Sequence, residues 1–221
     1  MASTSNLAIF AMSIASTGAN PVLSGNISVT GNVSVNNSLA VGATFSTIGA
    51  PANGAIMQGN VGIGTATPTA NLQVTGTAFF PGTASSLAAI LTNSTETVNI
   101  VAAAPSATQT FYLNLGAVQY YTSNATVNWA VNIATSASTT LANALSVGQS
   151  VTLAMLASQG SSAYYNNNVQ VDGSTGGVTT YWQGGTAPTK GNANGIDVYQ
   201  YTVVKTAATP TYTILASQVQ Y

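Results

Sequence analysis

The sequence predicts an all-β protein with a short N-terminal β-repeat stalk, followed by an antiparallel β-sandwich or jelly-roll-like domain. A six-residue repeat with alternating apolar positions runs through residues 25–48. Short alternating segments rich in Val, Thr and Tyr recur along the second half of the chain. From residue 97 onward only residues 139–145 favour a helix, and that segment is too short to be stable without packing. These observations together predict the all-β class.

The stalk is predicted from four successive hexads, GNISVT (25–30), GNVSVN (31–36), NSLAVG (37–42) and ATFSTI (43–48). Their third and fifth positions are mostly apolar, which is the period of a half-buried strand. Each repeat needs neighbours to bury its apolar face, so a single chain would bury too little. We therefore expect three intertwined chains over residues 20–50. The alternative is a plain hairpin pair attached to the sandwich.

The stretch GNVGIGTATPTANLQVTGTA (59–78) resembles a phosphate-binding glycine loop only in part. A dinucleotide fingerprint needs a third glycine and a following helix, whereas Thr67 and Pro68 stand there and residues 72–74 alternate as a strand. We interpret the stretch as a structural joint at which three backbones come close. The apolar residues expected around the trimer axis are Ile27, Val29, Val33, Val35, Leu39, Val41, Val61, Ile63, Leu72 and Val74.

The chain is expected to comprise four parts. Residues 1–19 form an N-terminal docking segment, 20–80 the stalk and its joint, 81–96 a low-complexity hinge, and 97–221 the head domain. The apolar run at 7–14 is shorter than the roughly 20 residues of a membrane helix, and no basic residue precedes it as in a signal peptide. The head contains nine predicted strands: 97–102, 110–115, 118–122, 126–134, 150–157, 169–172, 178–182, 197–206 and 211–217.

Charge is the outlier of the composition. Two lysines and three acids make up 2% of 221 residues, and the chain has no Arg, His or Cys. Lys190 and Lys205 cannot form a basic groove for nucleic acid, and a Ser-His-Asp or Cys-His site is impossible. We therefore expect no enzymatic activity, no cofactor, no nucleic-acid partner and no membrane insertion. A near-neutral surface favours association, although a monomer coated with neutral polar residues is the alternative.

The three acids are Glu96, Asp172 and Asp197. A meeting of Asp172 with Asp197 would be the one arrangement for paired-carboxylate catalysis, but Asp172-Gly173 is better explained by turn chemistry. Calcium could use Asp and Asn oxygens, either at 166–168 with Asp172 or at 192–194 with Asp197. Solvated loops are the simpler interpretation of both asparagine-rich segments.

Three aromatic pairs are candidates for stacking on surface sugars. Tyr and Trp supply rigid, amphipathic contact area. Adjacent residues of a strand point to opposite faces, so we expect one member of each pair to lie in the core or an interface. The pairs are Tyr120 with Tyr121, Tyr164 with Tyr165, and Tyr181 with Trp182.

Two resemblances follow from these motifs. The sequence NVGIGT (60–65), followed by Pro68 and LQVTGTA (72–78), resembles a segment of bacteriophage tail-fibre and tailspike proteins, where it joins β-structured stalk modules. Residues 95–221, with TVNWAVNIA (126–134), SVGQSVTLAMLA (146–157), VQVDG (169–173), WQGG (182–185) and IDVY (196–199), resemble a domain common in virion proteins of cyanophages and other marine phages. The resemblance implies a virion structural role without established activity.

The expected function is that of a homotrimeric tail fibre or appendage in the virion of a tailed phage. It would anchor to other virion proteins of the tail, neck or capsid by its N-terminus and present C-terminal heads for host attachment, with a host cell-surface glycan as a candidate partner. The alternative is a capsid decoration or cement protein that stabilises the head lattice. A depolymerase of surface glycans is a third, less favoured hypothesis because acids are scarce.

Overall fold

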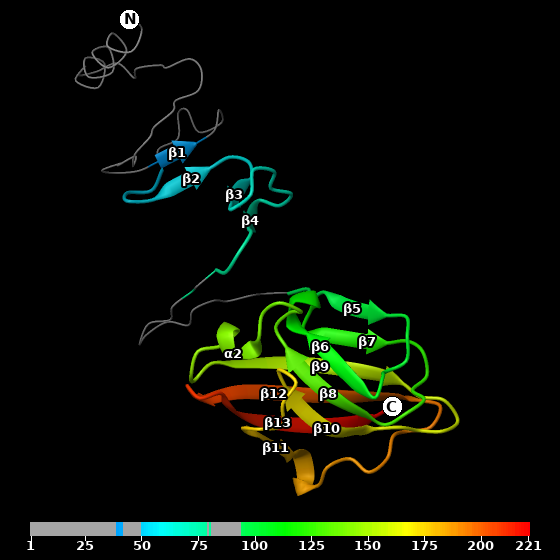
Figure 1. Cartoon of the computed structure of the whole chain (residues 1–221). Coiled ribbons are helices and arrows are strands. Elements are labelled where there is room, and N and C mark those ends of the chain that lie inside the picture. The colour runs from blue at the N-terminus through cyan, green and yellow to red at the C-terminus, as the bar shows by residue number, and fades with distance from the viewer. Residues whose placement is uncertain (1–38, 42–49, 79, 81–93) are drawn as a thin grey trace, which may run out of the picture. The chain divides into compact units, whose positions relative to one another are not determined.

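The computed structural model describes residues 39–41, 50–78, 80 and 94–221. The chain divides into two units, Met1–Ala89 and Ile90–Tyr221, which are described separately below (Figure 1). The predicted docking segment 1–19, the first hexads with Ile27, Val29, Val33 and Val35, and most of the hinge 81–96 lie outside the described residues.

The described part of the N-terminal unit consists of two short parallel strand pairs. Strand β1 (Leu39–Val41) pairs with β2 (Ala55–Met57), and β3 (Val61–Ile63) pairs with β4 (Leu72–Val74). In the second pair Val61 lies opposite Leu72 and Ile63 opposite Val74, so these four side chains share one face. Ile63 is 55% exposed and Leu72 60%. The apolar face of the β3–β4 pair is therefore largely uncovered by the described residues.

The glycines of the joint have a reason within the chain itself. A Cβ on Gly62 would lie 2.5 Å from the Thr65 carbonyl oxygen, and one on Gly64 would lie 2.7 Å from that of Thr75. Gly64 also has a φ of 73°, which favours glycine. The loop between β3 and β4 is closed by a 2.9 Å hydrogen bond from Asn60 Nδ2 to the Pro68 carbonyl. Close approach within one chain thus accounts for glycines that the sequence assigned to crowding between three chains.

The described residues of the C-terminal unit, 94–221, form nine strands, so the predicted all-β class is confirmed. Each strand overlaps one predicted segment, and the segment predicted as helical holds the single-turn helix α2 (Leu141–Ala144). Residues Leu113–Leu115 form the 3₁₀ helix η2 rather than the end of a strand. The strands are β5 (Val98–Val101), β6 (Thr108–Tyr112), β7 (Val118–Tyr121), β8 (Trp129–Ala134), β9 (Ser150–Ser158), β10 (Asn166–Val171), β11 (Val178–Trp182), β12 (Ile196–Ala207) and β13 (Thr211–Gln220).

These strands form two sheets, and the chain alternates between them from β5 to β10 (Figure 1). The larger sheet has the order β11-β13-β12-β9-β7-β5, and the smaller has the order β10-β8-β6. Strands that are next but one in the chain are therefore neighbours in the same sheet. Strands β5 to β10 thus follow one another as three successive pairs, and each pair has one strand in the larger sheet and one in the smaller.

The predicted antiparallel pairing is corrected by this alternation. Five of the seven strand pairings between the described residues of this unit are parallel, and the two antiparallel ones join β12 to β9 and to β13. An antiparallel neighbour usually follows a short hairpin turn, whereas parallel neighbours need a longer crossover. Here each crossover contains a strand of the opposite sheet, so the chain returns to its first sheet in the original direction. Short strands with turn residues between them are compatible with either path.

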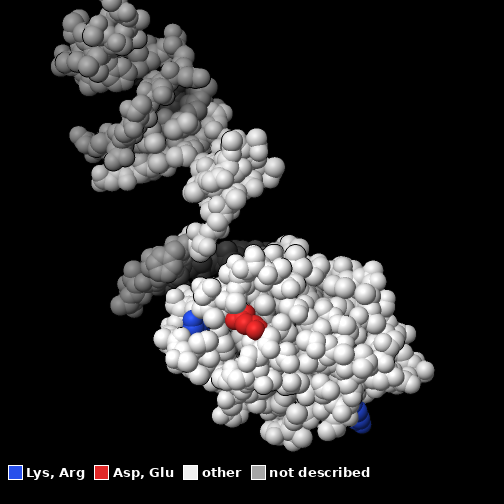
Figure 2. Space-filling view, viewed as in Figure 1, with Lys and Arg blue, Asp and Glu red and all other residues white. Residues whose placement is uncertain are grey.

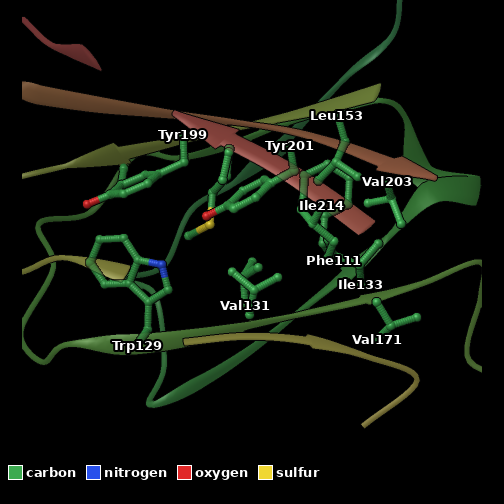
Figure 3. Close-up of a cluster of buried hydrophobic side chains, with 14 of the residues drawn as sticks. Phe111, Trp129, Val131, Ile133, Leu153, Val171, Tyr199, Tyr201, Val203 and Ile214 are labelled. Carbon is green, nitrogen blue, oxygen red and sulfur yellow. The ribbon is translucent and has the colours of Figure 1, made fainter. Parts of the chain in front are cut away.

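The core lies between the two sheets and is rich in aromatic side chains. Figure 3 shows Trp129 and Val131 of β8 pointing toward Tyr199 and Tyr201 of β12. The rings of Trp129 and Tyr199 meet edge to face, with centroids 5.6 Å apart. Strand β12 alternates, as expected for the short segments of the second half of the chain, because its odd-numbered residues from 197 to 205 are buried.

Two neighbouring core tyrosines allow a matched prediction. The Tyr199 hydroxyl accepts hydrogen bonds from Asn166 N at 3.2 Å and Gln218 Nε2 at 3.0 Å, whereas the buried Tyr201 hydroxyl has no partner among the described residues. Because an unpaired buried hydroxyl is costly, we expect Tyr201→Phe to raise the free energy of unfolding and Tyr199→Phe to lower it, each by about 1 kcal/mol. Urea denaturation of both variants measures this, and equal losses in both would contradict it.

Candidate carbohydrate-binding face and the charged side chains

The structure separates the candidate aromatic pairs. Tyr121 is buried, its hydroxyl donates to Gln119 Oε1 at 3.0 Å, and burial raises the pKa of this phenol to about 12. Tyr120 is half-buried on the opposite side of β7. Trp182 is also half-buried and meets Tyr201 edge to face at 6.2 Å. Its neighbour Tyr181 is 60% exposed. The expectation that adjacent residues divide between core and surface is confirmed for these two pairs.

The third pair lies in the loop before β10 and has a structural role. The Tyr164 backbone is held by Gln159, whose Oε1 accepts from Tyr164 N at 3.0 Å and whose Nε2 donates to the Tyr164 carbonyl at 2.6 Å. Tyr165 N donates to Asn128 Oδ1 at 3.0 Å. Both tyrosine side chains are half-buried. Of the six candidate aromatics, Tyr181 is therefore the one that offers a largely exposed ring.

A groove with a volume of about 420 Å³ lies on the outer face of the larger sheet beside Tyr181. Its size falls within the usual range of ligand sites, roughly 300–1,000 Å³. The side chains along it are neutral, and most carry hydroxyl or amide groups. The lining residues are Thr152, Tyr181, Trp182, Gln183, Gln200, Thr202, Leu215, Ala216 and Ser217.

The same outer face carries a continuous apolar row at another level of the sheet. The strand registers place Ile100 beside Tyr120, Tyr120 beside Leu156, Leu156 beside Val198, and Val198 beside Val219. Ile100 is 60% exposed and Val219 39%. Since an outward sheet face is usually polar, this apolar row is a candidate surface for contact with another protein.

Asp172 and Lys205 hold the two ends of helix α2. The carboxylate of Asp172 accepts from Leu141 N at 2.7 Å and Ala142 N at 3.0 Å. The buried ammonium of Lys205 donates to the carbonyls of Ala142 at 2.6 Å and Leu145 at 2.8 Å. A negative charge at the start of a helix and a positive charge at its end also suit the helix dipole. The two side chains thus act as a clamp on a single helical turn.

Asp197 is the centre of a second, buried polar network. Its Oδ2 accepts from Gln159 Nε2 at 2.9 Å, and both of its oxygens accept from Asn192 N at 3.2 Å. A Cβ on Gly191 would lie 2.6 Å from Oδ2, so only glycine fits there without movement. Asp197 therefore fixes the loop before β12, whereas Asp172 binds helix α2. The structure gives the two aspartates separate structural partners, and their meeting as a catalytic pair finds no support.

The buried carboxyl of Asp197 predicts a pH dependence of stability. Burial raises its pKa above the ordinary value of 3.8, although hydrogen bonds from Asn192 and Gln159 oppose the shift. The carboxyl of Asp197 therefore binds its proton more tightly in the folded chain than in the unfolded chain. The stability that this protonated carboxyl contributes is complete below pH 3.8 and is lost as the pH rises through the folded-state pKa. We expect the free energy of unfolding to decline over that range in urea titrations, and Asp197→Asn to remove that part of the decline. An unchanged decline in the variant would contradict this.

The described residues contain no group of three or more His, Cys, Asp or Glu side chains that could hold a metal ion. The two asparagine-rich segments considered for calcium have protein partners instead. Asn166 Nδ2 donates to the carbonyls of Trp129 and Asn168, and Asn192 Nδ2 donates to that of Tyr221. These amides therefore act as donors within the fold.

Comparisons with protein-family models, with curated proteins and with solved structures found no match to this chain. Among the described residues there is also no helix with the length and apolar character needed to span a bilayer.

Proposed function

We propose that the chain is a non-enzymatic structural protein of a tailed-phage virion, a trimeric appendage that anchors by its N-terminal part and presents its C-terminal heads to the host surface. The observation that carries the proposal is the use of the charged side chains. Three of the five in the chain, Asp172, Asp197 and Lys205, bind backbone groups that shape the head. Charged side chains that bind the backbone in this way support a structural role rather than a catalytic one.

The two remaining charged side chains also lack the surroundings of a catalytic group. Glu96 and Lys190 are exposed, and the chain has no His or Cys that could act with them. Figure 2 shows the visible face of the C-terminal unit almost entirely white, with isolated red and blue patches. A neutral surface of this kind suits contacts that depend on shape and neutral hydrogen bonds.

The trimer is supported by the uncovered apolar faces of the N-terminal unit. Leu39, Val41 and Met57 lie on one face of the first strand pair and are 39–46% exposed, and Ile63 with Leu72 is exposed on the second. Isolated two-stranded pairs are at best marginally stable in water. Copies of the same segment would cover these faces, and three heads on one stalk would turn weak contacts into useful avidity.

The salt dependence of assembly follows from the same composition. At about 1 M salt the screening length is roughly 3 Å, so exposed ion pairs contribute little. With 2% charged residues, the contacts between copies would be apolar and neutral. Assembly should therefore change little with salt, and a strong salt dependence would count against the proposal.

The experiment that tests the proposed function is the protein composition of purified phage particles. The proposal predicts that the chain copurifies with intact particles through a density gradient and is detected in them by mass spectrometry. Recovery of the chain only in the soluble fraction of the lysate, and never in particles, would contradict it.

A further inference from the structure

The exposed Tyr181 belongs to a row of side chains that crosses the outer face of the larger sheet. The strand registers place Tyr181 beside Leu215, Leu215 beside Thr202, and Thr202 beside Thr152. The next row toward the apolar one pairs Gln200 with Ser217. An aromatic ring, an exposed Leu and several hydroxyl and amide groups thus lie together on one rigid sheet.

The groove beside Tyr181 has a neighbouring hollow on the same outer face. This hollow, of about 250 Å³, shares Thr152 and Gln200 with the groove and extends to Glu96, Ala117 and Val118. A separate hollow of about 260 Å³ lies on the other side of β11, where Trp182 meets Tyr201 and Gln218 binds the Tyr199 hydroxyl. We call the groove and the first hollow together the outer-face trough. Its continuity suits an extended ligand rather than a single small molecule.

The amides in this trough are available to a ligand. In the part of the chain that the structure describes, the side chains of Gln183 and Gln200 make no hydrogen bond to another protein group, and both are exposed. Each amide offers two donors and an acceptor with two lone pairs. Such groups match the hydroxyls of a sugar, which both donate and accept, while an aromatic ring supplies apolar area for the face of the sugar ring.

The charge of the trough restricts the ligand further. Neither lysine of the chain lines the trough, and the one charged side chain that does is Glu96. An acidic sugar would find no cation to pair with and would be repelled by this carboxylate. A neutral sugar has no such penalty, and its hydroxyls can donate to the same carboxylate.

We propose that the outer-face trough binds a neutral hexopyranose chain, with one ring stacked on Tyr181 and its hydroxyls hydrogen-bonded by Gln183, Gln200 and Ser217. The inference rests on the proposed role of the heads at a host surface and names the chemical class that they recognise. Contact by one head is weak, and a trimer gains its avidity from three such sites.

The test is titration of the purified full-length protein with neutral oligosaccharides of glucan, mannan, galactan and N-acetylglucosamine. Binding is followed by calorimetry and by tryptophan fluorescence, since Trp182 borders the site and the second tryptophan, Trp129, is buried. We expect at least one neutral series to bind at millimolar concentration or better, with little change between low and high salt. Polygalacturonate and heparin should bind at least tenfold more weakly.

Substitutions assign the binding to Tyr181. Tyr181→Ala should weaken it at least tenfold, while Tyr181→Phe retains it within about threefold because the ring remains. Val219→Ala, on the same outer face but outside the trough, is the matched control and should bind as the wild type does. Unfolding curves show whether each variant is folded.

Three results would overturn the inference: no binding of any neutral series, undiminished binding by folded Tyr181→Ala, or binding of the acidic polymers at least as tight as that of the neutral ones. These results leave the proposed function intact if the chain is present in particles. Conversely, absence from particles would overturn the proposed function even where the sugar binding is observed.

Discussion

Replacing Lys205 by Met is expected to lower the free energy of unfolding of the C-terminal unit by about 3 kcal/mol. The substitution keeps an apolar chain of similar length but removes the ammonium that binds the carbonyls of Ala142 and Leu145. Two carbonyls are then left without their charged donor beside a buried side chain, and hydrogen bonds to charged groups contribute about 1.5–3 kcal/mol each. Urea denaturation followed by tryptophan fluorescence measures the loss.

The other lysine provides the matched control for this substitution. Lys190 is exposed, and its backbone carbonyl accepts hydrogen bonds from the side chains of Gln218 and Gln220. Lys190→Met removes the same charge and should change stability by less than about 0.5 kcal/mol. Equal effects of the two substitutions would show that the loss comes from net charge rather than from the clamp on helix α2.

Ile63→Asp is expected to abolish or strongly weaken the proposed trimer while the C-terminal unit remains folded. Ile63 is 55% exposed and shares the apolar face of the β3–β4 pair with Val61, Leu72 and Val74. At a three-fold axis the substitution would bring three carboxylates together in an apolar contact, where each unpaired charge is costly. Light scattering should change from the trimer mass, three times 22.1 kDa or about 66 kDa, toward that of one chain.

Asn71→Asp is the control for the added negative charge. Asn71 is exposed in the loop before β4, and its backbone carbonyl accepts from Val61 N. The side chain can carry a carboxylate without entering the apolar face, so the trimer should persist. A trimer that survives Ile63→Asp unchanged would contradict the assignment of this face to the stalk axis.

The strands of the head could be predicted from the sequence because alternation is a local signal. In β12 the alternating residues Tyr199, Tyr201 and Val203 lie on one face and are fully buried. The pairing partners could not be predicted, because they depend on which sheet each crossover enters, and a turn-rich connection is compatible with both. The parallel pairing of strands β5 to β10 is therefore known only from the structure.

The roles of the charged residues were missed, although part of the signal was present. Asp197 and Lys205 are in phase with the buried aromatic residues of β12, so the same alternation indicates that both are buried and need partners. Their partners, Asn192, Gln159 and the end of helix α2, lie in other segments. No local pattern identifies them.

The aromatic candidates divide for a similar reason. The rule that neighbouring strand residues face opposite sides predicts that one of Tyr181 and Trp182 is exposed, but it cannot say which. The choice depends on β11 pairing with β13 in a register that places Trp182 against Tyr201. The exposed ring and the trough beside it therefore follow from long-range pairing.

The most direct test of the central claim, that this chain is a structural appendage of a phage particle, is gold labelling of intact particles by electron microscopy. Particles carrying a short peptide tag at the C-terminus of the chain are labelled through the tag. If the chain is a tail or neck appendage, the label is confined to the tail or neck and is displaced outward from the particle axis. Label spread evenly over the capsid would favour the decoration-protein alternative, and particles without any label, although the tagged chain is present in the lysate, would contradict the account.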